Sequence, residues 1–448
     1  MSFEPTRREF LYQSVGLAAA TRLSRAAAVT PRIWPGFPLY SQFSPKVPVW
    51  CVTPKLQGCL HRFFDTSPVS PSGRYLGVTR LRDETRMPAF GDAADIVVVD
   101  LTTGDTEVVA ETRGFGTQLG AQVQWGATDQ DLFYSDVDTE KWRVFTVHMN
   151  PLTRAKRTLN GPLYMVSPNG KQIVSPCLLR TELTQSGYGV VAPATHLPLN
   201  SQADENDGIY LTDVESGQCR LLASFRKIVS ALPEALAGPM YTGGAFYGFH
   251  AKWNPQGTRL MFILRYRPMQ GGVNARAEGT ANVCTLSPEG GDICLAFPGK
   301  LWRAGGNHPN WAPDGIHITM NFNLYGKGLL FVQYRYDGSD LRALSADIPG
   351  SGHPSLHVNG RFLMTDAYTW EPLAFGDGTT PIRWIDLRQN RAEAIIRIGT
   401  KPTYAGPMDG LRVDPHPAWD RSQTRVTFNA CPKGYRQVFL ADMSDLLS

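Results

Sequence analysis

The segment His250-Ala-Lys-Trp-Asn-Pro-Gln-Gly-Thr-Arg-Leu-Met-Phe262 contains a pattern that recurs along this chain. A polar residue is followed three positions later by an aromatic residue, then by a Pro-x-Gly turn and an alternating apolar stretch. Together these features predict a β-hairpin. The pattern returns in residues 308–315, 353–360 and 416–419. Four copies of one hairpin indicate a repeat protein.

Three weaker copies appear when the aromatic position accepts any apolar residue, at 66–69, 122–125 and 163–166. A second apolar strand follows each of the seven copies, in residues 97–100, 145–147, 209–213, 283–286, 330–332, 383–386 and 438–440. Seven repeats of short strands with Gly-rich turns predict an all-β fold, a seven-bladed β-propeller that occupies residues 40–448 as a single domain. The last repeat ends too early to hold a fourth strand. We therefore expect a strand from about Val49 to Leu56 to complete that blade.

The first 29 residues have the pattern of a twin-arginine export signal. Arg7-Arg8 is followed by Phe10-Leu11, a weakly apolar run and three alanines at 26–28. The alternative is an exposed basic start to an ordinary helix. No apolar run reaches the roughly 18 residues that a membrane-spanning helix needs. We expect a monomer without a membrane anchor that is exported to the periplasm or secreted.

Composition restricts the classes of partner. A net charge of +4 over 448 residues is too small and too dispersed to indicate nucleic-acid binding. The seven cysteines form no metal-type Cys-x-x-Cys pair. Cys284 with Cys294, or Cys51 with Cys59, could form a disulfide in an oxidising compartment, or each could be a separate buried residue.

Four histidines, His250, His308, His353 and His416, occupy the same position of successive repeats. At the start of consecutive inner strands they would all face the central axis. Neutral imidazoles that converge on a channel favour a divalent metal ion, with zinc first and manganese or calcium as other choices. The alternative is that each histidine fills its strand and bonds a neighbouring carbonyl.

The connections between strands carry a second set of candidates. His61 stands in the segment that enters the first blade and is a candidate general base. Arg143, next to Trp142, offers a planar fork for a carboxylate and a ring that can stack on a sugar. Tyr188, between two glycines on the long connection 180–206, could act as an acid or could fix its loop. Arg82, Tyr247 and Arg265 are further candidates for substrate contacts, with Trp142.

A histidine, a tyrosine and an arginine on one rim suit β-elimination from a uronic acid. The arginine neutralises the carboxylate and acidifies the C5 proton, one side chain removes that proton, and another protonates the departing O4. The sequence leaves open which of His61 and Tyr188 is the base. Gly271-Gly272 and Gly305-Gly306 lack the strand–Gly-x-Gly–helix context of a dinucleotide site, so we expect no organic cofactor.

The segment 61–73, the 122–125 strand, the Trp142-Arg143 pair, Gly187-Tyr-Gly189 and the His-x-x-Trp strands together resemble the seven-bladed propeller polysaccharide lyases. This group includes ulvan lyases, rhamnose-glucuronate lyases and, more distantly, oligogalacturonate lyases. The resemblance implies proton transfer by His61 and Tyr188, carboxylate neutralisation by Arg143 and a metal ion on the four strand histidines. It implies an anionic, uronate-containing polysaccharide or oligosaccharide as the substrate.

Two departures from that pattern bear on the substrate. Residues 79–86 contain three arginines and no second histidine, and Val190 stands where a second aromatic residue is expected. Both favour a rhamnose-glucuronate type of glycan, or another uronate-containing glycan, over ulvan. Two other functions fit the repeats: a non-catalytic periplasmic propeller of the TolB type that binds a protein or glycan, and a metal-containing oxidoreductase.

Overall fold

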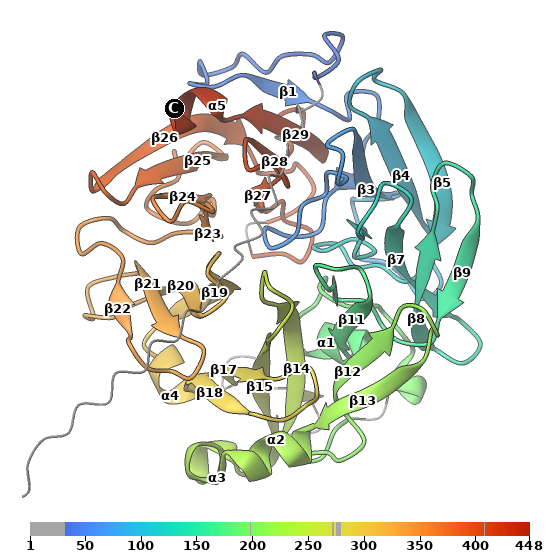
Figure 1. Ribbon diagram of the computed structural model, residues 1–448, viewed down its shortest axis with the longest axis vertical. Helices are drawn as coiled ribbons and strands as arrows, with labels where there is room; N and C mark the ends of the chain where they lie inside the picture. The colour runs from blue at the N-terminus through green and yellow to red at the C-terminus, as the bar shows by residue number, and fades with distance from the viewer. Residues whose placement is uncertain (1–31, 198, 271–272, 275–278, 407) are drawn as a thin grey trace, which may run out of the picture.

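The computed structural model describes residues 32–448, apart from 198, 271–272, 275–278 and 407. This part of the chain is nearly all β and forms a seven-bladed β-propeller, seen down its axis in Figure 1. The predicted fold class is confirmed. The predicted export signal, residues 1–29, lies outside the described residues. Among the helices within the described residues, none is long and apolar enough to cross a membrane.

Each blade is an antiparallel sheet whose strands follow one another outward from the axis. The first three blades are β2 (Cys59–Leu60), β3 (Tyr75–Leu81), β4 (Ala94–Asp100) and β5 (Thr106–Thr112); β6 (Gln124–Trp125), β7 (Leu132–Asp138), β8 (Arg143–Met149) and β9 (Lys156–Leu159); and β10 (Met165–Val166), β11 (Gln172–Pro176), β12 (Gly208–Asp213) and β13 (Cys219–Ser224).

The next three blades are β14 (Gly244–Trp253), β15 (Leu260–Gln270), β17 (Thr280–Leu286) and β18 (Cys294–Phe297), with β16 (Val273–Asn274) beside β15; β19 (Gly306–Trp311), β20 (His317–Phe322), β21 (Leu330–Arg335) and β22 (Arg342–Ala343); and β23 (Ser355–Leu356), β24 (Phe362–Thr365), β25 (Thr379–Asp386) and β26 (Arg391–Gly399). Six of the predicted second strands are therefore present in these blades, as β4, β8, β12, β17, β21 and β25, and the seventh is β29 (Gln437–Asp442) of the last blade.

The two ends of the propeller close on each other in the seventh blade. It contains β27 (Ala418–Trp419), β28 (Arg425–Ala430) and β29 (Gln437–Asp442), and its outermost strand is β1 (Val49–Cys51). Val49 pairs with Ala441 and Cys51 with Phe439. β1 lies beside β29 at the top of Figure 1, which confirms the expected closing strand, although the strand ends at Cys51 and not near Leu56.

The predicted turns explain why the inner hairpins form. Gly257 and Gly315 both have φ of 68°, a left-handed conformation that glycine adopts without steric cost. Their N–H groups donate to the carbonyls of Asn254 and Ala312, each at 2.9 Å. The Pro-x-Gly motif therefore fixes the reversal between the first and second strands of these blades.

The prediction for the first inner strand was wrong. Residues 66–69 form no strand, and Val69 makes only an isolated bridge with Leu76. The observed strand β2 comes earlier, and residues 61–66, which we name the plug, follow directly after it. Phe63 and Phe64 of the plug are 1% and 2% exposed. Two aromatic rings are stabilised by leaving water, and this burial outweighs continuation of the strand.

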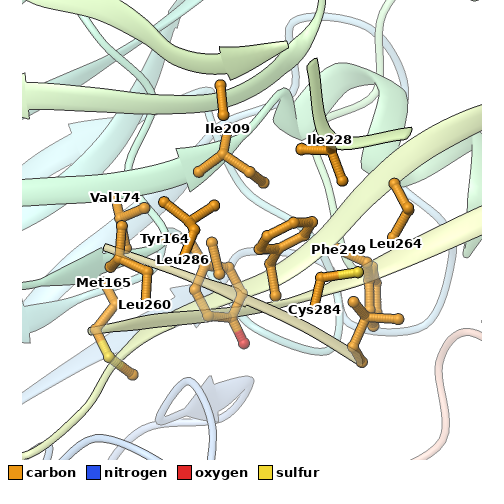
Figure 2. Close-up of a cluster of buried hydrophobic side chains, with 14 of the residues drawn as sticks. Tyr164, Met165, Val174, Ile209, Ile228, Phe249, Leu260, Leu264, Cys284 and Leu286 are labelled. Atoms are coloured by element: carbon orange, nitrogen blue, oxygen red, sulfur yellow. The ribbon is translucent and has the colours of Figure 1, made fainter. Parts of the chain in front are cut away.

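The hydrophobic core lies within and between the blades. Figure 2 shows part of its largest cluster, in which Tyr164, Val174 and Ile209 of the third blade pack with Phe249 and Leu260 of the fourth. Helices lie at the periphery or in connections: α1 (Leu178–Thr184), η1 (Ala194–His196), α2 (Phe225–Ala231), α3 (Pro233–Leu236), η2 (Pro239–Tyr241), α4 (Gly299–Trp302) and α5 (Ser444–Leu447). All seven cysteines are free thiols, so neither candidate pair forms a disulfide.

Candidate functional site

A cavity of about 710 Å³ opens beside the second half of β14 in the fourth blade and the first half of β19 in the fifth. Its wall includes His250 of β14, His308 of β19 and Phe63 of the plug. Long connections add residues 185–188, 368–371 and 408–412. A second cavity, of about 430 Å³, is lined by the residues at the far ends of the same strands. The first cavity therefore gathers segments from distant parts of the sequence around one end of the channel.

The strand histidines adopt an uncommon backbone conformation. His250, His308 and His416 have φ of 49°, 55° and 51°, in the left-handed region that few non-glycine residues occupy. The pairing of β14 with β15 shifts register immediately beside His250, and that of β19 with β20 does so beside His308. Such bulges redirect a side chain. The imidazoles of His250 and His308, beside the two bulges, lie against the ring of Phe63. The imidazole of His416 lies against the same ring.

Two of these histidines form a group that could hold a metal ion. Ligand atoms of His353, Asp414 and His416 all lie within 4.8 Å of one another, and all three residues are buried. Nδ1 of His353 is 3.0 Å from both carboxylate oxygens of Asp366, which directs its Nε2 away from that carboxylate. Neither ring nitrogen of His416 has a hydrogen-bond partner. Burial lowers the pKa of His416 well below its ordinary value, and a neutral imidazole is the form that binds metal.

The other two histidines have different partners. His308 lies beside His353, with ring centroids 3.9 Å apart. Its Nδ1 is 2.5 Å from the carbonyl of Gly352 and its Nε2 is 3.1 Å from the Tyr368 hydroxyl. Nδ1 of His250 is 2.5 Å from the hydroxyl of Tyr164. His250 is thus joined to the third blade, while the metal-type group joins the sixth and seventh blades.

Basic side chains predominate in the cavity wall. Four of the described residues that line it are basic, namely Lys252, Arg265, Arg267 and Arg412. The one acidic residue among them is Glu371, and burial raises its pKa to about 7. Close to neutral pH this carboxyl is only partly ionised, so it cancels little of the positive charge. Two of the four basic side chains are paired with buried carboxylates, Lys252 with Asp65 at 3.1 Å and Arg412 with Asp414 at 3.0 Å, so the wall carries a smaller net positive charge than its basic residues alone suggest.

Tyr188 reaches the cavity because its loop is held by hydrogen bonds. The N–H groups of Gly187 and Gly189 donate to the carboxylate of Glu182 in α1, at 2.8 and 3.1 Å. A Cβ at Gly189 would lie 2.1 Å from the carbonyl oxygen of Leu178, so the glycine is required there. Burial raises the pKa of Tyr188, whose hydroxyl accepts a hydrogen bond from Arg412. The phenol therefore keeps its proton at neutral pH.

The structure brings some predicted site residues together and separates others. Tyr188, His250, His308 and Arg265 line the cavity. The remaining candidates outside the metal-type group do not line it: His61, Arg82, Trp142, Arg143 and Tyr247.

These five residues have other surroundings. His61 is 1% exposed, neither ring nitrogen has a hydrogen-bond partner, and burial lowers its pKa to about 3. Arg143 is exposed at the start of β8, and the neighbouring Trp142 packs against Phe90. Tyr247 is fully buried, and Arg82 pairs with two acidic side chains.

Several site residues were not singled out from the sequence. Arg412, Tyr368 and Glu371 lie on connections outside the repeat, where no template marks them. Asp414 was missed although a signal was available, since it stands two residues before His416 as Asp-Pro-His. A carboxylate at that spacing can share a metal ion with the histidine.

No protein-family model matches the sequence, and no curated protein matches it. Among solved structures, the fold is similar to an oligogalacturonate lyase in complex with manganese, at 14% identity over 91% of this chain and 96% of that chain, with a TM-score of 0.60. An oligogalacturonate lyase from Vibrio parahaemolyticus gives the same identity, coverage and TM-score. TolB-like propellers also match, such as a putative TolB from Agrobacterium tumefaciens, at 12% identity over 75% of this chain and 94% of that chain, with a TM-score of 0.36. The comparisons thus show a propeller fold that this chain shares with oligogalacturonate lyases.

Proposed function

We propose that this protein is a carbon–oxygen lyase that cleaves a uronate-containing glycan by β-elimination. The observation that carries the proposal is the cavity, whose wall combines four basic side chains with His250 and Tyr188. The similarity in fold to oligogalacturonate lyase supports it. The departures seen in the sequence favour a rhamnose-glucuronate type of glycan as the substrate.

The side chains of the cavity supply the three groups that the reaction needs. A base takes the C5 proton, the released electron pair forms the C4–C5 double bond, and the O4 leaving group departs with its bonding electrons and receives a proton. We assign the base to His250, because it lines the cavity next to Tyr188 and its buried ring is unprotonated before substrate binds. We assign the acid to Tyr188. Their ring centroids are 5.8 Å apart, so a sugar ring can contact both.

The roles of base and of carboxylate contact therefore differ from those expected from the sequence for His61 and Arg143. His61 is enclosed, and Arg143 projects from another part of the rim, so neither lines the cavity that contains Tyr188. Arg412 is better placed than Arg143 to neutralise the uronate carboxylate, since it lies beside Tyr188. A guanidinium that is already positioned lowers the cost of charge at C5 without rearrangement in the transition state.

The buried group of His353, Asp414 and His416 fits a divalent ion. Two imidazoles and one carboxylate form a common donor set, and the unpartnered nitrogens of His416 are what a metal would satisfy. None of these three residues lines the cavity, so a bound ion would lie behind the cavity wall and would supply positive charge to the site from there. Manganese is present in one structural neighbour, and zinc suits the imidazole ligands.

Aromatic rings at the cavity complete a surface suited to a sugar. Trp370 is 43% exposed and stacks on Tyr368, with centroids 4.2 Å apart and planes inclined by 14°. Both residues line the cavity, as does Trp302. An exposed indole face that is already held by a second ring can stack on a pyranose with little loss of side-chain entropy.

The test is incubation of the purified protein with a panel of uronate polysaccharides and oligosaccharides. Elimination produces a conjugated unsaturated uronate that absorbs in the ultraviolet, and hydrolysis does not. A rise in absorbance with a glucuronate-containing glycan, and none with neutral glycans, is expected. Binding of a glycan or protein without any cleavage would instead support a TolB-type function.

A further inference from the structure

His250 is connected to the charged residues of the plug through a single hydroxyl group. Its Nδ1 lies 2.5 Å from the hydroxyl of Tyr164, and that hydroxyl lies 3.4 Å from Oδ2 of Asp65. The three residues belong to the fourth blade, the segment before β10 and the plug. Figure 2 shows Tyr164 within the cluster that also contains Phe249, the neighbour of His250. The chain of contacts therefore runs from the cavity wall into the interior.

Asp65 is the charged end of this chain. Burial opposes its ionisation, but Arg62 at 2.8 Å and Lys252 at 3.1 Å outweigh burial, so the pKa of Asp65 lies below its ordinary value. The carboxylate can therefore only accept hydrogen bonds. Burial raises the pKa of Tyr164 well above its ordinary value, so its hydroxyl keeps one proton to donate.

That single proton restricts the direction of both hydrogen bonds. If Tyr164 donated to His250, its oxygen would face the Asp65 carboxylate at 3.4 Å with no proton between them. If Tyr164 donates to Asp65, a proton on Nδ1 of His250 completes the other contact, and every group in the chain is satisfied. The arrangement in which Tyr164 donates to Asp65 is favoured, because an ionised carboxylate is a stronger acceptor than a neutral imidazole.

We propose that Tyr164 and Asp65 are positioning residues that hold His250, which lines the cavity, as its Nδ1–H tautomer and so leave its Nε2 unprotonated. The tautomer follows from the contacts alone, whereas its use as the base that removes the C5 proton rests on the proposed function. When Nε2 takes a proton, Nδ1–H already points along a path that ends at a carboxylate. The orientation of the base therefore needs no change during the reaction.

Charged and titratable groups around His250 come from several elements. Those that act on it are Arg62 of the plug, Lys252 of β14, Arg265 of β15 and His308 of β19, with the hydroxyls of Tyr164 and Tyr188 nearby. The first four all disfavour a charged imidazolium at rest, as does burial. The ring is therefore neutral before substrate binds, and the choice between its two tautomers is the property to measure.

The experiment uses the full-length protein labelled with ¹⁵N-histidine, without any substrate. The His250 signals are identified by their loss in His250→Gln. Wild type should show the chemical shifts of an Nδ1–H tautomer at this residue. Tyr164→Phe removes only the hydroxyl, and it should shift His250 toward the Nε2–H form. Tyr334→Phe is the matched control, because it removes another fully buried tyrosine hydroxyl, one that lies near Met320, and it should leave the His250 signals unchanged.

Activity gives the second measurement once a substrate is known. Tyr164→Phe should lower kcat by about 10- to 100-fold, with KM nearly unchanged, the range found for outer partners that orient a functional imidazole. An Nε2–H tautomer in the wild type, or an unchanged tautomer in Tyr164→Phe, would overturn the inference. If no glycan is cleaved, the proposed function fails, but the tautomer of His250 in the wild type still decides whether Tyr164 and Asp65 orient that ring.

Discussion

Nη2 of Arg412 donates a hydrogen bond of 2.8 Å to the hydroxyl of Tyr188. Arg412 lies between β26 and β27, and Tyr188 follows α1 of the third blade, so the bond joins two distant parts of the ring. The same guanidinium is 3.0 Å from Asp414 of the metal-type group. Arg412 therefore links the proposed acid to the proposed metal centre.

Arg412→Ala should lower kcat by about 100-fold or more, because it removes a preorganised charge next to the developing carbanion. Arg143→Ala provides the comparison, since that residue is the arginine first considered for the same role. Circular dichroism should show both variants folded. The reverse result, a large loss of kcat in Arg143→Ala and none in Arg412→Ala, would show that Arg143 and not Arg412 binds the substrate carboxylate.

Tyr188→Phe should lower kcat by roughly 100- to 10,000-fold, the contribution usual for one acid–base group. The hydroxyl accepts a hydrogen bond from Arg412, which lies in a connection between strands, so the melting temperature should change little. Tyr247→Phe is the matched control, because its hydroxyl is buried, has no hydrogen-bond partner and lies outside the cavity. Equal rates for the two variants would remove Tyr188 from the reaction.

The sequence predicted the blades because their signals are local. A hairpin with Pro-x-Gly is specified by a few adjacent residues, and Gly257 and Gly315 adopt the left-handed turn that the pattern implies. The plug was missed for the opposite reason. Its conformation depends on Asp65 meeting Lys252 and on Phe63 meeting four histidine rings, and those partners are far away in the sequence.

The candidate site was predicted in part for similar reasons. Tyr188 was found because the glycines on either side of it mark a constrained loop, and the strand histidines because they recur in register. Arg412 and Tyr368 carry no such mark, and their place in the cavity follows from the closure of the ring. His61 was selected because Arg62 and two phenylalanines follow it, but these residues are buried in the central channel and not exposed at its edge.

Purified protein should contain about one equivalent of a divalent metal by elemental analysis, with zinc or manganese as the main candidates. The double variant His353→Ala/His416→Ala should lose it, because two ligands are removed from the metal-type group. His250→Gln should retain the metal, since Nδ1 of that residue is engaged by Tyr164. Metal-free protein that is fully folded and active would contradict the site.

Glu371 should make folding stability depend on pH. Burial raises the pKa of its carboxyl from 4.5 to about 7, so between these values the unfolded chain releases a proton that the folded protein retains. Stability contributed by this group is therefore lost as pH rises from about 4.5 to about 7. Glu371→Gln cannot ionise and should show a smaller fall in melting temperature over that window. Glu289→Gln, at an exposed position, should behave as wild type.

Phe63→Ala tests whether the plug supports the metal-type group. The Phe63 ring is 1% exposed, and its centroid lies 5.4 Å from that of His353 and 4.7 Å from that of His416. Removal of the ring should cost about 3–5 kcal/mol of stability, as for other buried phenylalanines, and should allow both imidazoles to turn.

Metal content measured after dialysis should then fall in Phe63→Ala. Phe262→Ala is the control, because Phe262 is fully buried in the core of the fourth blade and should cost a similar amount of stability while the metal is retained. The comparison separates general destabilisation from a loss of ligand orientation. If both variants retain the same metal content, the plug fills the channel without orienting the histidines, and the donor set holds its geometry through Asp366 and the backbone of the sixth and seventh blades alone.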